Sequence, residues 1–302
     1  MNLISSPTHA PSFFEATART RIREILDPGS FTEILPPGSI GTSPHLARLG
    51  IPGAFDDGVI TGSGELNHLP VLVAAQEGRF MGGAVGEIHG AKIRGLLERA
   101  LQIKPAAVLL LIDSGGVRLH EANAGLIAIS EIIRAVLAVR NAGIPVIALV
   151  GGSCGAFGGM GIVARLCSAI IISEEGRLAL SGPEVIETVK GVEEFDSKDR
   201  ALVWRITGGK HRFLTGDCDA LADDNCASFR RAAIQCLTIK KPKPVSLENL
   251  RAEQDRLRER LERFGKFRDG IDVWRTLGIP QPETIPIMEN SELIRLKSRL
   301  GL

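Results

Sequence analysis

The chain has 302 residues, 44% of them hydrophobic, so it is long enough to bury a complete α/β core. A net charge of +1 and an aromatic content of 4%, without any tyrosine, give no electrostatic or stacking reason to bind nucleic acid and exclude tyrosine as a catalytic acid. The longest apolar run, 106–112, falls far short of the roughly 20 residues that cross a bilayer, so no membrane span is expected.

The cysteines and the first residues indicate the compartment. The start of the chain lacks the basic residues and apolar run of a signal peptide, so we expect a cytoplasmic protein. The cysteine number is odd, and no pair has C-x-x-C spacing, which favours reduced thiols. Six histidines without ligand spacing predict that the chain binds no metal.

Apolar runs alternate with helical patterns along the chain. Helical periodicity predicts helices over 84–103 and 119–142, the second ending at Gly143. Apolar runs predict strands over 70–76, 106–112, 145–150 and 168–173. Because strands and helices alternate, we expect an α/β core with a largely parallel sheet.

The composition changes near residue 240. The stretch "KKPKPV" is typical of a linker, and the charged amphipathic sequence after it predicts a helix. We therefore divide the chain into a main domain, 1–239, and a C-terminal helical extension, 240–302. A solvated helical tail and a docking surface for a partner are both compatible with the extension.

Two glycine-rich stretches follow predicted strands, "DSGGV" at 113–117 and "GGSCGAFGG" at 151–159. Glycine allows positive φ angles and close approach to the main chain, and a helix start directs further N–H groups to the same place. Backbone donors of this kind suit a thioester oxygen that becomes an enolate. The alternative is that these glycines only permit tight turns.

The second stretch also matches two other patterns. "GGSCG" fits the nucleophile elbow of α/β-hydrolases, with Ser153 as nucleophile, but His211 is the only histidine that follows it. "GMGIVA" matches a dinucleotide fingerprint, yet eight residues separate Val150 from Gly159, whereas that turn begins directly at the strand end. A serine hydrolase therefore remains a lesser alternative.

Several segments resemble the carboxyltransferase domains of biotin-dependent acyl-CoA carboxylases. The similarity extends over about residues 15–225, and the motifs that carry it lie at 18–34, 56–93, 113–122, 151–159 and 180–187. The resemblance implies a crotonase-like fold, a spiral of ββα units with an oxyanion hole.

Departures from this family narrow the resemblance. No cysteine precedes Cys154, so the four-cysteine zinc ribbon of the bacterial acetyl-CoA carboxylase β-type subunit is absent, and 302 residues hold one lobe only. The chain most resembles the β subunits of biotin-independent malonate decarboxylases. That family implies as partners a γ-type carboxyltransferase-like subunit, an acyl carrier protein and an acyltransferase subunit.

The implied reaction is decarboxylation of malonyl-S-acyl-carrier-protein to the acetyl thioester and CO2. The resemblance implies no cofactor bound by this chain, because the substrate is a thioester on a phosphopantetheine-like, dephospho-CoA-derived arm of the carrier. A carboxyltransferase subunit of a biotin-dependent complex is the main alternative. A noncatalytic subunit that completes the partner's site is a further one.

Site residues are carried over from the resemblance. The expected oxyanion donors are backbone N–H groups of Gly115, Gly116, Val117, Gly155 and Ala156. Arg118 is a candidate for positioning an anion, and His120 or Glu121 for supplying a proton, although a structural role is an alternative for each. The remaining candidates for lining the substrate pocket are Ser114, Cys154, Phe157, Gly83 and His89.

Overall fold

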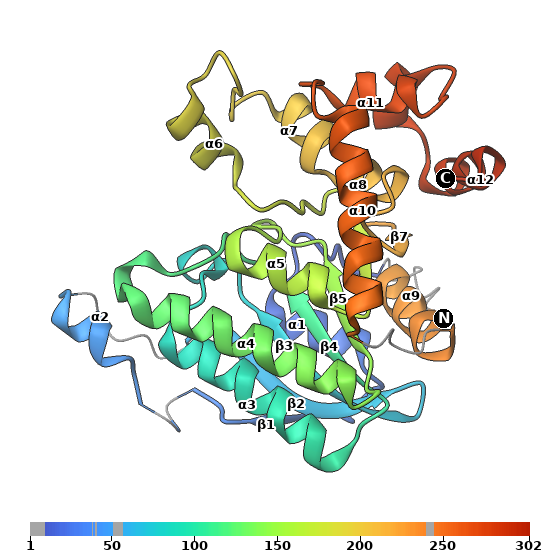
Figure 1. The fold of residues 1–302 in the computed structure, drawn as a ribbon. Coiled ribbons are helices and arrows are strands. Elements are labelled where there is room, and N and C mark those ends of the chain that lie inside the picture. Colours follow the sequence, from blue (N-terminus) through green and yellow to red (C-terminus); the bar gives the residue numbers. More distant parts are fainter. Residues whose placement is uncertain (1–9, 38, 40, 51–56, 240–244) are drawn as a thin grey trace, which may run out of the picture.

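A computed structural model describes residues 10–37, 39, 41–50, 57–239 and 245–302. Within these residues, seven strands form one sheet in the order of the sequence (Figure 1). The strands are β1 (Thr32–Ile34), β2 (Val59–Leu66), β3 (Leu69–Gln76), β4 (Ala107–Ile112), β5 (Val146–Val150), β6 (Ala169–Ser173) and β7 (Ala220–Ala222).

Strand direction divides the sheet into two parts. Strands β1, β2 and β3 are antiparallel, and β3 to β7 run parallel to one another. The four strands predicted from apolar runs are confirmed as β3, β4, β5 and β6, and the expected parallel core is found. All residues of β4, β5 and β6 are buried, as is typical of parallel strands that helices cover on both faces.

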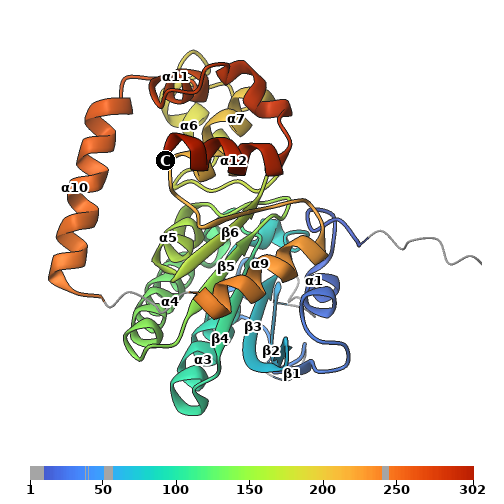
Figure 2. The same ribbon diagram turned by 90° about the vertical axis from the view of Figure 1, so that its right-hand side faces the viewer.

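Helices cover both faces of the sheet (Figures 1 and 2). Leu110 faces a core shared with α3 (Glu87–Ile103), α4 (Asn123–Asn141) and α5 (Gly158–Leu166). Its neighbour Leu109 faces the opposite core, shared with α1 (Ala18–Ile25) and α9 (Cys226–Ile239). Side chains that alternate between two cores give a three-layered α/β body.

Both predicted helices begin later than the periodicity indicates. Helix α3 starts at Glu87 rather than at 84, because Val85 pairs with Val117 in extended conformation. Helix α4 starts at Asn123 rather than at 119, because a 3-10 turn at Leu119–Glu121 precedes it and Ala122 has a positive φ of 48°. The first glycine stretch therefore does not open directly into a helix.

Short extended segments form a second layer beyond the carboxyl ends of the parallel strands. Isolated bridges join Val85 to Val117, Ser114 to Ala156 and Ala156 to Leu178. Each of these segments follows a strand of the main sheet. The chain thus repeats the pattern of strand, short extended segment and helix, as expected for a spiral of ββα units.

The C-terminal part of the chain is helical. Trp274, Ile285 and Leu293 belong to the same buried cluster as the sheet, so this part shares a core with the main body. The proposed boundary at 240 falls beside residues 240–244, which lie outside the described residues. The remaining elements are α2 (Pro44–Arg48), α6 (Pro183–Lys190), α7 (Arg200–Thr207), α8 (Gly209–Leu214), α10 (Leu247–Phe264), α11 (Gly270–Thr276), α12 (Asn290–Leu300), and the 3-10 turns Met81–Gly83 and Pro282–Ile287.

Helix α10 differs from the other long helices because it has no buried residue. It runs along the side of the molecule from the main body to the upper helices (Figure 2). Arg260 on this helix bonds both carboxylate oxygens of Asp217, at 2.7 and 3.0 Å. Among the described residues, no helix is both long and apolar enough to cross a membrane.

Candidate active site

Four loops meet where the parallel strands end, and the second layer of bridges joins them side by side. They span 77–86, 113–118, 151–159 and 174–182. We call 113–118 the first glycine loop and 151–159 the second glycine loop. The candidate residues Gly83, Ser114, Gly116, Cys154 and Phe157 all lie in these loops.

Asp113, at the start of the first glycine loop, connects it to the second glycine loop. Its carboxylate forms a buried ion pair of 2.9 Å with Arg21 and accepts a 2.6 Å hydrogen bond from the N–H of Cys154. A Cβ atom on Gly152 would lie 2.1 Å from the Asp113 carboxyl carbon, and one on Gly83 would lie 1.8 Å from the Asp113 carbonyl oxygen. These two glycines are therefore needed so that the loops can approach Asp113.

The N–H groups of the first glycine loop have different partners. Ser114 donates to the carbonyl of Gly155, Gly115 to that of Gly82, and Gly116 to the hydroxyl of Ser114 at 3.1 Å. Within the described part of the chain, the N–H of Val117 has no acceptor. Val117 as a whole is only partly buried.

Several donors of the second glycine loop bind carbonyl groups of the protein. Gly155 donates to Gly152, Ala156 to the carbonyl of Arg177 at 2.8 Å, and Phe157 to Ser114. The next free donor is the N–H of Gly159, which has no acceptor among the residues that the structure describes. Gly159 lies in the first turn of α5, where helix N–H groups lack partners and the helix dipole is positive.

The two free donors follow a direct contact between the loops. A Cβ on Gly116 would lie 3.4 Å from the Cα of Gly158, and a Cβ on Gly158 would lie 3.2 Å from the Cα of Gly116. Val117 and Gly159 are the next residues after these two glycines. Their N–H groups therefore lie where the two glycine loops touch.

Arg118 and Glu121 form a buried ion pair of 2.9 Å. Arg118 also donates to the carbonyl of Ala84, and Glu121 accepts from the N–H of Glu87 at 2.5 Å. Both side chains are almost fully buried. They therefore stabilise the start of α3, which favours the structural role for both.

The two candidate histidines lie in different surroundings. His89 is fully buried and its Nε2 lies 3.0 Å from the amide nitrogen of Gln76. Burial, reinforced by Arg118 and Lys92, lowers the pKa of His89 to about 3, so its imidazole is neutral. His120 is exposed and lies on the 3-10 turn beside the first glycine loop.

Ser153 lacks the surroundings of a serine nucleophile. Its side chain is exposed, and among the described residues its hydroxyl contacts only the thiol of Cys154, at 4.0 Å. His211 is buried and makes no hydrogen bond with Ser153. Burial and the nearby Asp113 raise the pKa of the Cys154 thiol, so it is not a thiolate either.

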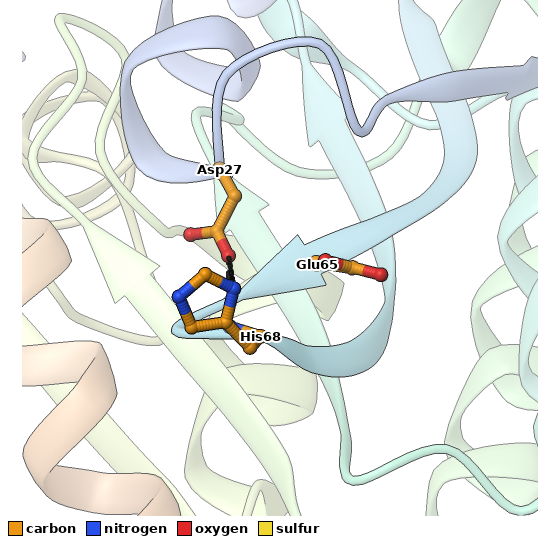
Figure 3. A group of neighbouring side chains, drawn as sticks. All are labelled: Asp27, Glu65 and His68. Carbon is orange, nitrogen blue, oxygen red and sulfur yellow. Dashed lines mark hydrogen bonds and ion pairs between the residues drawn. The ribbon is translucent and has the colours of Figure 1, made fainter.

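Among the residues that the structure describes, one group lies close enough together to hold a metal ion: Asp27, Glu65 and His68 (Figure 3). The carboxylate of Asp27 already accepts hydrogen bonds from Arg230 and from the N–H groups of Asn67 and His68. The bond from Arg230 is the main cause that lowers the pKa of Asp27 to about 2. Asp27 thus closes the β2–β3 turn, and the absence of a metal stays a prediction.

A cavity of about 730 Å³ lies between α5, the segment 178–180 and α10, and no residue of either glycine loop lines it. Its apolar wall includes Ile162, Leu178, Leu180, Leu257, Leu261 and Phe264. Its volume lies in the range of sites that take small organic ligands.

Residues 15–242 match the family model of the carboxyl transferase domain, and the chain belongs to this family. The crotonase-like fold expected from the sequence is thereby confirmed. Among curated proteins, the chain is 41% identical to the malonyl-S-ACP:biotin-protein carboxyltransferase MADC of Malonomonas rubra, over 96% of each chain.

Two solved structures from Pseudomonas are also similar. One is a malonate decarboxylase hetero-tetramer in complex with malonate, with 42% identity, a TM-score of 0.81, and coverage of 88% of this chain and 97% of that chain. The other is the malonate decarboxylase MdcD–MdcE hetero-dimer, with 38% identity, a TM-score of 0.66, and coverage of 82% and 96%.

Three features of the site were not predicted from the sequence. The roles of Asp113 and Gly159 could have been suspected, since the first ends a buried strand and the second lies in the glycine-rich run. Arg177 lies in a polar stretch without a pattern, and only the fold brings it to the second glycine loop.

Proposed function

We propose that the chain is the β-type subunit of a malonate decarboxylase, which converts malonyl-S-acyl-carrier-protein into the acetyl thioester and CO2. The similarity to MADC extends over 96% of each chain, and the Pseudomonas subunit is matched over 97% of its length. The observation that carries the mechanism is the pair of free N–H groups where the glycine loops touch.

In this reaction the bond between the α-carbon and the carboxylate breaks. The carboxylate leaves as CO2, and the electron pair moves onto the thioester oxygen as an enolate, which then takes up a proton at carbon. The N–H groups of Val117 and Gly159 stabilise that oxygen as its charge develops. The chain needs no nucleophilic side chain for this step.

The oxyanion donors proposed here differ from those expected from the sequence. Gly155 and Ala156 donate to backbone carbonyls, and Gly115 and Gly116 also have acceptors within the chain. We therefore retain Val117 and assign the second donor to Gly159. The other four residues then set the shape of the loops rather than bind the oxygen.

The substrate arm and the partners are part of the same proposal. We propose that the chain binds no cofactor of its own and that the cavity beside α5 accommodates a phosphopantetheine-like arm. We propose a γ-type carboxyltransferase-like subunit as the direct partner, with an acyl carrier protein and an acyltransferase subunit completing the complex. Exposed apolar side chains, Leu119, Leu126 and Ile127, follow the first glycine loop and offer a surface for such a partner.

Reconstitution tests this function. The chain is purified with its γ-type partner, supplied with malonyl-S-carrier, and CO2 and the acetyl thioester are measured. We expect turnover by the pair, little by the chain alone, and no effect of avidin. A pair that leaves the malonyl thioester intact would overturn the proposal.

A biotin-dependent carboxyltransferase is the second candidate, since MADC is named as acting on a biotin protein. In that case the carboxylate passes to biotin on a carrier protein rather than leaving directly as CO2. Complete inhibition by avidin, together with a requirement for a biotin carrier, would favour this candidate.

A further inference from the structure

Arg177 lies directly beside the second glycine loop. Its carbonyl accepts the 2.8 Å hydrogen bond from the N–H of Ala156, and a Cβ on Gly155 would lie 3.1 Å from the Cβ of Arg177. Its neighbour Leu178 is buried in the core, so the Arg177 side chain leaves the opposite side of the extended segment. The guanidinium therefore belongs to the same site as the loops.

The surroundings of Arg177 hold its guanidinium in place. Its central carbon lies 5.5 Å from the ring centre of Phe157 and 5.4 Å from that of Trp204. One of its terminal nitrogens donates to the carbonyl of Ser153. Two aromatic rings and one backbone bond restrict a side chain that would otherwise move freely.

In the described part of the chain, Arg177 is not paired directly with a carboxylate, and the nearest negative charges, Glu184 and Asp113, act on it only from a distance. Its Nε atom is buried without a hydrogen-bond acceptor among these residues. Two other arginines that contact the glycine loops are paired, Arg21 with Asp113 and Arg118 with Glu121, each at 2.9 Å. Burial lowers the pKa of the Arg177 guanidinium, and the more distant Glu184 carboxylate offsets this only in part.

We propose that Arg177 binds the free carboxylate of the malonyl group and thereby selects malonyl over acetyl thioesters. This inference rests on the proposed function, because it names the group that recognises the substrate. The carboxylate is one methylene away from the thioester carbonyl, and an acetyl group lacks it. A planar guanidinium matches a carboxylate with two parallel hydrogen bonds.

The chemistry of the reaction predicts how this contact affects the kinetics. The ion pair exists in the bound substrate and is lost when the carboxylate becomes neutral CO2. Arg177 therefore stabilises the bound substrate at least as strongly as the transition state. Its removal should raise KM and leave kcat unchanged or slightly higher.

The test uses the reconstituted pair of subunits with Arg177→Met and Arg177→Lys. Calorimetry measures binding of the malonyl and acetyl amide analogues of pantetheine, in which nitrogen replaces the thioester sulfur. Since a hydrogen bond to a charged group contributes about 1.5–3 kcal/mol, the Met variant should bind the malonyl analogue about 10- to 100-fold more weakly. Binding of the acetyl analogue should change less than about threefold, and Lys should retain part of the preference.

Three results would overturn the role of Arg177: unchanged malonyl binding by the Met variant, equal weakening of both analogues, or a loss of kcat at constant KM. Equal weakening would indicate a structural role in the loops. Failure of the proposed function is a separate outcome, in which the unmodified pair neither binds the malonyl analogue nor cleaves the malonyl thioester.

Discussion

The two glycine loops are both rich in glycine, yet their backbone N–H groups have different hydrogen-bond partners. In the first loop, the N–H of Val117 is left free beside a glycine turn. In the second loop, the N–H groups of Ala156, Phe157 and Gly158 hold neighbouring segments, and a donor without an acceptor among the described residues follows at Gly159 in α5. A glycine-rich strand end can therefore serve packing alone, and its donors must be traced individually before any is assigned to a substrate.

The largest effect is expected at Asp113, which ties the two loops together. Asp113→Asn leaves Arg21 buried without its counter-charge, so the free energy of unfolding should fall by about 3–5 kcal/mol. Urea unfolding of the purified pair measures this loss. A loss below about 1 kcal/mol, the size typical of an exposed ion pair, would contradict the buried pair. As a control, Arg21→Met combined with Asp113→Leu removes both charges and should restore part of the stability.

A second effect concerns the buried histidines of each region, and its size depends on pH. His89 contacts the side chain of Gln76, whose amide oxygen accepts a hydrogen bond from the N–H of Asp113 at the start of the first glycine loop. His211 lies near the C-terminal extension. Burial lowers the pKa of each imidazole from 6.5 to about 3. As the pH falls below 6.5, the unfolded chain takes up these protons first, so stability decreases toward pH 3.

The slope should approach ~1.4 kcal/mol per pH unit for each histidine that stays neutral in the folded state. Proton NMR of the imidazoles reports their protonation directly. Both should remain neutral at pH 5 in the folded protein. Titration of either with an ordinary pKa would contradict the buried, neutral state.

The smallest effect is expected at Ser153, which tests the second loop as a scaffold. Ser153→Ala keeps every backbone donor, so the rate of malonyl-thioester decarboxylation should stay within about tenfold, a barrier change below ~1.4 kcal/mol. The matched variant Ser114→Ala removes the acceptor of the Gly116 N–H and should cost more, because it disturbs the first loop. Loss of all activity in Ser153→Ala alone would revive the hydrolase alternative.

Much of the fold could be predicted, because fully buried parallel strands leave apolar runs such as 106–112 and because Gly143 ends a helix in the expected way. Helix starts were less predictable. The bridge between Val85 and Val117 keeps both segments extended, and such a contact joins residues far apart in the sequence.

The site was predicted only to the level of its loops. Which N–H is free depends on which carbonyl lies opposite, for example Arg177 opposite Ala156, and no local pattern contains that information. Proline at Gly116, a natural way to remove a donor, is unsuitable, because Gly116 has a φ of 125° and proline requires about −65°. The donor is therefore better tested at the next residue, Val117.

The most direct measurement replaces the amide of Val117 by an ester, through incorporation of the α-hydroxy analogue of valine. The side chain is kept and the N–H is lost, and no internal hydrogen bond depends on it among the described residues. We predict that kcat for malonyl-thioester decarboxylation falls by roughly 10²–10³ while the folded structure and partner binding are unchanged. The same replacement at Ala156, whose N–H bonds Arg177, should reduce stability by about 1 kcal/mol and spare kcat. An unchanged kcat with the Val117 ester would contradict the assignment of this donor to the oxyanion.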